Sequence, residues 1–168
     1  MINIGLFYGS TIGKTEIGEI IQQEFGEDVV TLHKITDVDN SDFEEYENLI
    51  IACPTWNIGQ LQSDSDSYFS HLDDIDFNRK KVAYFSTGGQ VGYADNFQDA
   101  MGILEEKISG LGSTTVGYWS RDGYDFTESK AVRDGKFVGL ALDEDNQLNL
   151  TGERIKAWVE QLKKEFCV

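Results

Sequence analysis

The stretch Phe7-Tyr8-Gly9-Ser10-Thr11-Ile12-Gly13-Lys14-Thr15 separates two patterns that decide the fold. An apolar run from Ile2 to Phe7 precedes it and is typical of a buried strand. After it, apolar residues recur at the spacing of one helix face, at Ile17, Ile20, Ile21 and Phe25. A tight loop between a strand and a helix N-terminus presents unpaired backbone N–H groups and the positive end of the helix dipole. Such a loop can bind a phosphate without a basic side chain.

Two nucleotide motifs resemble this stretch but do not match it. A nucleotide P-loop needs four residues between its first Gly and the Gly-Lys-Ser/Thr, whereas Gly9 and Gly13 enclose three. A dinucleotide fingerprint needs a Gly where Thr11 stands. The stretch alone therefore leaves two interpretations open: a phosphate loop assisted by hydroxyl groups, or an ordinary strand-to-helix turn capped by Ser or Thr.

Length and composition indicate a single domain over residues 1–168 with a substantial core. Apolar residues make up 40% of the chain, but no apolar run approaches the roughly 20 residues of a membrane span. The chain does not open with a signal-peptide pattern, and Cys53 and Cys167 lack C-x-x-C spacing. We therefore expect a cytoplasmic protein with two free thiols and no membrane insertion.

The charge of the chain limits its partners. Thirty acidic and fourteen basic residues give a formal charge of −16. Nucleic acid and anionic membranes would be repelled, whereas a basic protein could dock on an acidic face. High solubility alone would also explain this charge.

Strand-like and helix-like segments alternate along the chain. Strands are expected at 2–7, Val29–Leu32, Asn48–Cys53, Val82–Phe85 and, as a divided fifth strand, Val116–Trp119 and Val138–Leu142. Helical spacing continues at Phe97, Met101, Leu104, Ile108 and Leu111, and again at Ile155, Trp158, Val159, Leu162 and Phe166. Asp42–Tyr46 is expected to be a short acidic connection and Ser63–His71 a weak helix.

This alternation predicts a parallel sheet with helices on both faces. Ligands bind such a sheet outside the carboxyl ends of its strands. The third predicted strand is followed by Pro54-Thr55-Trp56-Asn57-Ile58-Gly59, and the fourth by Ser86–Asn96, which contains Tyr93. The aromatic residues Trp56 and Tyr93 lie on polar loops outside any core periodicity, so they suggest a flat ring held between aromatic faces.

Over its whole length the sequence resembles long-chain flavodoxins of the cyanobacterial and algal type. The resemblance rests on four further stretches: Gly13-Lys14-Thr15-Glu16, Pro54–Gly59, Gly92-Tyr93-Ala94-Asp95-Asn96-Phe97-Gln98-Asp99-Ala100 and Asp143-Glu144-Asp145-Asn146-Gln147. It implies a three-layer α/β/α sandwich with a five-stranded parallel sheet of order 2-1-3-4-5. The polar segment Ser120–Lys136, called the insertion below, resembles the segment that interrupts the last strand of long-chain members.

The resemblance also implies non-covalent FMN and names the residues that would hold it. Trp56 and Tyr93 would stack on the isoalloxazine ring, Asn57 and Ile58 would face its N5 atom, and the loop around Tyr93 would meet its pyrimidine edge. The phosphate would lie in the first loop. The complete set is Gly9, Ser10, Thr11, Ile12, Gly13, Lys14, Thr15, Pro54, Thr55, Trp56, Asn57, Ile58, Gly59, Thr87, Gly88, Gly89, Tyr93, Asn96, Phe97 and Gln98.

Three features depart from the family pattern. Ile12 replaces a common Thr and removes one candidate phosphate hydroxyl, and Gly89 replaces a usual Asp near the ring. The acidic run after the third strand is reduced to Asp64-Ser65-Asp66, with Gln60 in place of a common Glu. The last change alters the surface expected to face a partner.

The implied function is low-potential one-electron transfer between redox proteins, in place of ferredoxin. The implied partners are ferredoxin–NADP reductase, photosystem I and nitrogenase reductase, with the chain acting as a monomer. Asp64, Asp66, Asp95, Asp99 and Asp125 are candidate docking charges. No catalytic residue is expected, and His33 and His71 have no companions at metal-ligand spacing, so no metal site is expected.

Two rival functions make different demands on these residues. An FMN-dependent reductase of small quinone or nitro substrates would need room over an exposed flavin face, which Trp56 and Tyr93 would cover. A signalling receiver domain would need acidic residues after the first strand and a phosphorylatable Asp after the third. Those places hold Tyr8-Gly9-Ser10 and Cys53-Pro54, which excludes the receiver.

Overall fold

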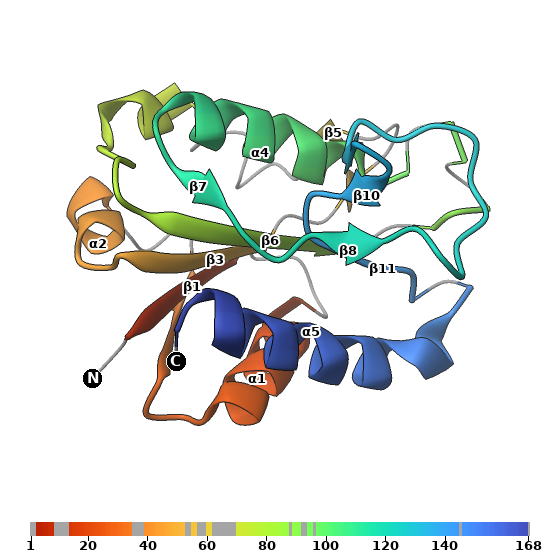
Figure 1. The fold of residues 1–168 in the computed structure, drawn as a ribbon, viewed down its shortest axis with the longest axis horizontal. Helices are drawn as coiled ribbons and strands as arrows, with labels where there is room; N and C mark the ends of the chain where they lie inside the picture. The colour runs from red at the N-terminus through yellow and green to blue at the C-terminus, as the bar shows by residue number, and fades with distance from the viewer. Residues whose placement is uncertain are drawn as a thin grey trace.

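A parallel sheet forms the centre of the molecule, with helices on both faces (Figure 1). The computed structural model describes residues 3–8, 14–34, 39–52, 55–56, 60–61, 70–87, 89–91, 94–95, 97–144 and 146–167. The sheet contains β1 (Ile4–Tyr8), β2 (Val30–Lys34), β3 (Asn48–Ala52), β6 (Lys81–Thr87), β7 (Thr114–Thr115) and β11 (Leu140–Leu142). Its order is β2-β1-β3-β6-β11, which confirms the expected order 2-1-3-4-5.

The fifth position of the sheet is divided between two strands, because β7 pairs with the beginning of β6 and β11 with its end. Lys81 lies opposite Thr114, and Thr87 opposite Leu142. A divided fifth strand was predicted, but its first half is Thr114–Thr115 and not Val116–Trp119. Gly117 has a positive φ of 82°, which breaks the extended backbone within the predicted segment.

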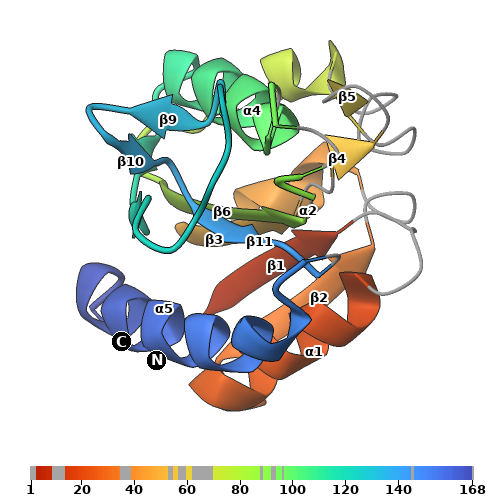
Figure 2. The same ribbon diagram turned by 90° about the vertical axis from the view of Figure 1, so that its right-hand side faces the viewer.

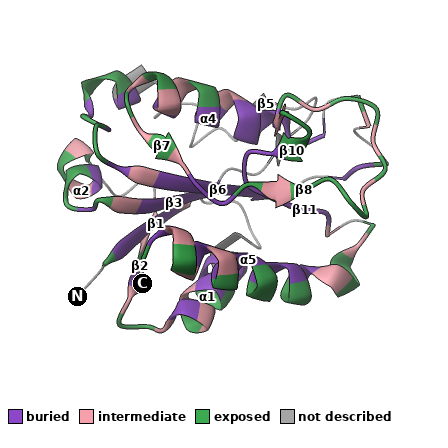
Figure 3. Ribbon diagram, in the orientation of Figure 1, coloured by how far each residue is buried: buried purple, intermediate pink, exposed green. Residues whose placement is uncertain are grey.

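Helices cover the two faces of the sheet unequally (Figure 2). One face carries α1 (Lys14–Phe25) and α5 (Thr151–Glu165), with the 3₁₀ turn η3 (Leu148–Leu150) leading into α5. The other face carries α4 (Asp99–Gly110), α2 (Asn40–Glu44) and the 3₁₀ turn η2 (Ser70–Asp74). Figure 3 shows buried strands between helices whose outer sides are exposed. None of the helices within the described ranges combines the length and apolar character needed to cross a bilayer.

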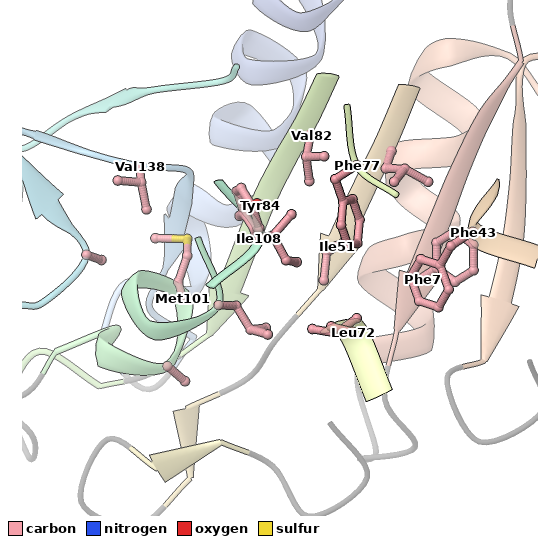
Figure 4. Packing of buried hydrophobic residues seen from close by; sticks show 14 of the residues in the cluster. Phe7, Phe43, Ile51, Leu72, Phe77, Val82, Tyr84, Met101, Ile108 and Val138 are labelled. Atoms are coloured by element: carbon pink, nitrogen blue, oxygen red, sulfur yellow. The ribbon is translucent and has the colours of Figure 1, made fainter. Parts of the chain in front are cut away.

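Alternation along the strands divides the core into two apolar layers. On β3, Leu49 and Ile51 face the layer under α4, while Ile50 and Ala52 face the layer under α1 and α5. Figure 4 shows the first layer, where side chains from β3, β6 and α4 meet. Trp158, one of the residues at the predicted helical spacing, lies fully buried in the second layer, and its indole N–H donates to the Gly117 carbonyl at 2.9 Å.

The expected acidic connection at Asp42–Tyr46 is wrong, because α2 lies there. Asp39 caps this helix: its carboxylate accepts from the Ser41 N–H at 3.0 Å, and the Asp42 carboxylate accepts from the Asp39 N–H at 2.9 Å. The hydrogen bonds from Ser41 lower the pKa of Asp39. Phe43 is buried and anchors the short helix on the core.

Smaller boundary differences concern the strands and the weak helix. β2 begins at Val30 and ends at Lys34, and β3 ends at Ala52. Of the expected helix Ser63–His71, only the start of the 3₁₀ turn at Ser70 falls within the described residues. Cys53 lies outside them, and Cys167 is an exposed free thiol, as expected.

The insertion folds with the residues next to it into a small antiparallel sheet and an aromatic cluster. The sheet consists of β8 (Trp119–Ser120), β9 (Val132–Arg133) and β10 (Lys136–Phe137), in the order β8-β10-β9. The rings of Phe97, Tyr124 and Phe126 surround the buried ring of Phe137, with centroids 5.1–5.8 Å from it. Aromatic burial therefore docks a segment that is polar in composition.

The stability of the protein at alkaline pH tests how Tyr124 holds the insertion in place. Its hydroxyl donates to the Ala141 carbonyl at 2.5 Å and accepts from the Trp119 indole at 3.0 Å. Burial raises the pKa of Tyr124 to about 12. The unfolded phenol ionises near pH 10, so its contribution is complete below about pH 10 and is lost as the pH rises through about 12. We expect Tyr124→Phe to cost about 1–2 kcal/mol at pH 7 through the lost hydrogen bonds.

Urea unfolding measured from pH 7 to pH 11.5 would check both parts of this prediction. The variant should lose stability less steeply above pH 10 than the parent protein does. Part of the slope should remain, because burial also raises the pKa of Tyr84. Parallel pH profiles for the two proteins would contradict the assignment to Tyr124.

Candidate functional site

The carboxyl ends of the central strands meet at one edge of the sheet. β1 ends at Tyr8, β3 at Ala52 and β6 at Thr87, and these strands are neighbours in the sheet. The topology reverses between β1 and β3, because β2 lies on one side of β1 while the later strands follow on the other. Such a switch point is where open α/β sheets bind ligands.

Helix α1 contributes hydrogen-bond donors to this edge. It begins at Lys14, immediately after residues 9–13, which follow β1. Lys14 and Thr15, which the sequence pattern assigned to the loop, therefore occupy its first turn. The first N–H groups of a helix have no partner within the helix and carry the positive end of its dipole, so this donor set fits a phosphate.

A short hairpin follows β3, where the sequence predicted a polar loop. It consists of β4 (Thr55–Trp56) and β5 (Gln60–Leu61), with Thr55 opposite Leu61 and Trp56 opposite Gln60. Two of the predicted FMN-binding residues, Thr55 and Trp56, thus lie on a strand with paired backbone. The hairpin places Trp56 beyond the end of β3, at the same edge as the start of α1.

The segment after β6 is held by buried polar contacts. Thr87 and Gly89 are buried, and so is Gln90. The backbone N–H and the side-chain amide of Gln90 both donate to Asp143 Oδ2, at 3.0 and 2.8 Å. Asp143 follows the end of β11, so this contact joins two neighbouring strand ends.

Asp143 is fully buried and keeps its charge through hydrogen bonds. Burial alone would raise its pKa, but the bonds from Gln90 and Asn146 outweigh it and hold the pKa below its usual value. The Asn146 backbone N–H donates to Asp143 Oδ1 at 2.9 Å. Neither Gln90 nor Asp143 was among the predicted site residues. The only signal was an acidic residue after the last strand followed three residues later by Asn, which is typical of an Asx turn.

Phe97 and Gln98 are oriented toward the protein interior. Both are fully buried. Phe97 lies 5.8 Å from Phe137 between ring centroids. Gln98 has a positive φ of 61°; its side-chain oxygen accepts from the Ser86 hydroxyl and its amide donates to the Leu142 carbonyl at 3.1 Å. Any contact of these two residues with a cofactor would therefore come from their backbone.

The remaining predicted site residues lie outside the described residues. They are Gly9, Ser10, Thr11, Ile12, Gly13, Pro54, Asn57, Ile58, Gly59, Gly88, Tyr93 and Asn96. Their assignment stays a prediction.

The candidate docking charges differ in their exposure to solvent. Asp95 and Asp125 are exposed, as a docking role requires. Asp99 is buried instead, and its Oδ1 accepts from the Lys130 N–H at 2.7 Å, so its expected role as a surface charge is wrong. Asp64 and Asp66 lie outside the described residues.

These features define a doubly wound α/β protein whose candidate ligand site lies at the carboxyl edge, beside the N-terminus of its first helix. A model of the family described as Flavodoxin matches residues 6–158. The chain belongs to the flavodoxin family. It is similar to a flavodoxin of a Nostoc species, with 68% identity over 97% of this chain and 96% of that protein. A Synechocystis flavodoxin is 64% identical over 97% of each chain.

A solved structure extends the comparison to three dimensions. The crystal structure of Fusobacterium nucleatum flavodoxin bound to flavin mononucleotide has a TM-score of 0.93, with 32% identity. The match covers 98% of this chain and 99% of that one. The agreement therefore includes the insertion as well as the central sheet.

Proposed function

We propose that this protein is a one-electron carrier that holds FMN non-covalently at the carboxyl edge of its sheet. The observation that carries the proposal is the start of α1 at the topological switch point, in a fold that matches an FMN-bound flavodoxin over nearly its whole length. FMN supplies the capacity to accept and release single electrons. The chain supplies binding, orientation and exclusion of water.

Residues from the three strand ends would share this work. The loop 9–13 with Lys14 and Thr15 would bind the phosphate. Trp56 and Tyr93 would cover the two faces of the ring, with a gain of about 0.5–1.5 kcal/mol per favourable aromatic pair beyond simple burial. The backbone at Asn57 and Ile58 and the segment after β6 would meet the ring edges. Thus only an edge of the ring is left for a partner.

The charge of the protein favours a low reduction potential. A formal charge of −16 and a bound phosphate both oppose the arrival of further negative charge in a water-poor site. The site as proposed contains no general base or nucleophile, in keeping with a carrier. Ferredoxin–NADP reductase, photosystem I and nitrogenase reductase are proposed as partners, with the protein acting in place of ferredoxin, as a cytoplasmic monomer.

The first test is the cofactor and the need for a partner. The purified protein should be yellow, and the released flavin should be FMN. It should not oxidise NADPH by itself, and it should accept electrons once a ferredoxin–NADP reductase is added. Rapid NADPH oxidation by the protein alone with a quinone or nitro compound would instead indicate an FMN-dependent reductase.

Salt provides the second test, because the proposed partners dock through basic faces. The rate of reduction by the reductase should fall by about tenfold or more between low and high ionic strength as the Debye length shrinks to a few ångströms. The single change Asp95→Asn should cost little, since exposed charges each contribute weakly. Reversal of Asp95 and Asp125 together should slow association and leave FMN affinity unchanged. Rates that respond to neither salt nor the double reversal would contradict electrostatic docking.

A further inference from the structure

Gln90 connects three segments of the chain at the candidate site. It is 3% exposed and lies three residues after the end of β6. Its backbone N–H and side-chain amide N–H both donate to Asp143, beyond the end of β11. Its side-chain oxygen accepts from the Asp125 N–H at 2.5 Å, within the insertion. The three groups through which Gln90 forms these hydrogen bonds thus all bind residues of other loops.

Burial of the Asp143 carboxylate at this position carries a large desolvation cost. Asp143 is 0% exposed, and no Lys, Arg or His of the described residues lies within ion-pair distance of its carboxylate. Donors serve both oxygens instead: Oδ2 accepts from Gln90, and Oδ1 accepts from the Asn146 N–H. A buried charge without an ion pair is stable only when such donors are fixed in place. The arrangement therefore rigidifies the loops that it joins.

The insertion holds the same region at further points. The Ala94 carbonyl accepts from the N–H groups of Thr127 and Glu128, at 2.7 and 2.9 Å. The Asp99 carboxylate accepts from the Lys130 N–H at 2.7 Å. The described parts of the connection between β6 and α4 are therefore attached to the insertion on one side and to the end of β11 on the other. The insertion passes beside this connection at the carboxyl edge of the sheet (Figure 1).

We propose that Gln90 and Asp143 are positioning residues, which hold the connection after β6 at the geometry that the flavin edge requires. Through Gln90, the insertion also restrains this connection. The inference rests on the proposed function, because the neighbouring Thr87, Gly89 and Tyr93 are the proposed FMN contacts. Gln90 and Asp143 act through that backbone and not by touching the cofactor. A merely structural pair would stabilise the fold and leave the flavin unaffected.

A negative charge introduced at Gln90, beside the Asp143 carboxylate, gives the sharpest test. In Gln90→Glu, a carboxylate replaces the amide donor and faces the Asp143 carboxylate, so the two groups repel each other. We expect the FMN dissociation constant to rise by about tenfold or more. The riboflavin dissociation constant should rise by a similar factor, because the perturbation is on the ring side and not at the phosphate. The visible circular dichroism of the bound flavin and its midpoint potential should also change.

A second change should relieve the first. In the double variant Gln90→Glu/Asp143→Asn, the new carboxylate can accept from the Asn amide, so part of the lost FMN affinity should return. Gln90→Met, of similar volume, removes the amide and adds no charge, so it should weaken FMN binding by a smaller factor. This variant takes the place of Gln90→Glu in the test if Gln90→Glu does not fold. Asp122→Asn, an exposed change within the insertion, serves as the control and should leave both flavins unaffected.

The outcomes separate this inference from the proposed function. If the parent protein binds neither FMN nor riboflavin, the proposed function is wrong. If the parent binds FMN and the Gln90 variants match its affinity, circular dichroism and potential, the positioning role is wrong even when their melting temperatures fall. Recovery in the double variant, with an unchanged ratio of FMN to riboflavin affinity, is the result expected from positioning residues.

Discussion

FMN is expected to bind this protein about a thousandfold more tightly than riboflavin, which lacks only the phosphate. Helix α1 begins at Lys14, directly after the loop that follows β1, so its free N–H groups and dipole converge on one place. Each hydrogen bond to a charged group contributes about 1.5–3 kcal/mol, and two bonds of about 2 kcal/mol each amount to about 4 kcal/mol, or about a thousandfold. Fluorescence titration of the cofactor-free protein with both flavins would measure the ratio.

The variant Gly13→Val tests whether that ratio comes from the loop backbone. A branched side chain there should crowd the loop and reduce the preference for FMN to about tenfold or less, while riboflavin affinity changes little. Gly18→Ala, in the helix that follows the loop, is the control. Its Cβ would lie 3.5 Å from Leu6 Cδ2, an ordinary contact, so the ratio should stay as in the parent protein. Equal affinities for the two flavins in the parent would contradict the phosphate loop.

The sequence predicted the layers of the fold well because its periodic signals are strong. Apolar runs such as 49–52 are buried on both sides in a parallel sheet, and the residues facing α4 and α5 follow helical spacing. The fifth strand was harder to predict, since a two-residue strand such as β7 has too few positions to show a period. β7 is defined by its pairing with β6, and the local sequence contains no signal for such a pairing.

Polar residues were predicted less well, because their role depends on distant partners. Asp99 was expected to be a surface charge, yet it is buried against the Lys130 N–H, which lies 31 residues away in sequence. Gln90 and Asp143 are separated by 53 residues, and no local pattern in the sequence pointed from one to the other. By contrast, α2 could have been found: Asp39 followed three residues later by Asp42 is a variant of the capping box.

The buried polar contacts of Asp99 and Asp143 have a common consequence. Each carboxylate accepts from a backbone N–H of a loop, Lys130 in one case and Gln90 in the other. Part of the acidity of the chain therefore serves to fix loops around the carboxyl edge, and only the exposed acidic residues remain for docking. The formal charge of −16 overstates the charge that a partner would meet at any one place.

The variant Gly102→Ala is expected to destabilise the protein by about 2–3 kcal/mol, which corresponds to a fall in melting temperature of about 5–10 °C. Gly102 lies in α4, where an added Cβ would be 2.2 Å from the Lys130 carbonyl oxygen and 2.7 Å from the Ala131 nitrogen. Both are backbone atoms, and the Lys130 N–H is held by Asp99, so the segment cannot simply move aside. The insertion must therefore separate from α4, or the helix must shift.

Gly110, at the end of the same helix, provides the matched comparison. A Cβ there has no heavy atom within 4 Å among the described surroundings. Because Ala is a better helix former than Gly, Gly110→Ala should leave stability unchanged or raise it by about 0.5 kcal/mol. Urea unfolding of the two variants at pH 7 would measure the difference. If both variants were equally stable, the insertion would be loosely packed on α4. A large loss of stability in Gly102→Ala alone would show that the contact between α4 and Lys130 is rigid. The insertion would then hold the connection after β6 firmly.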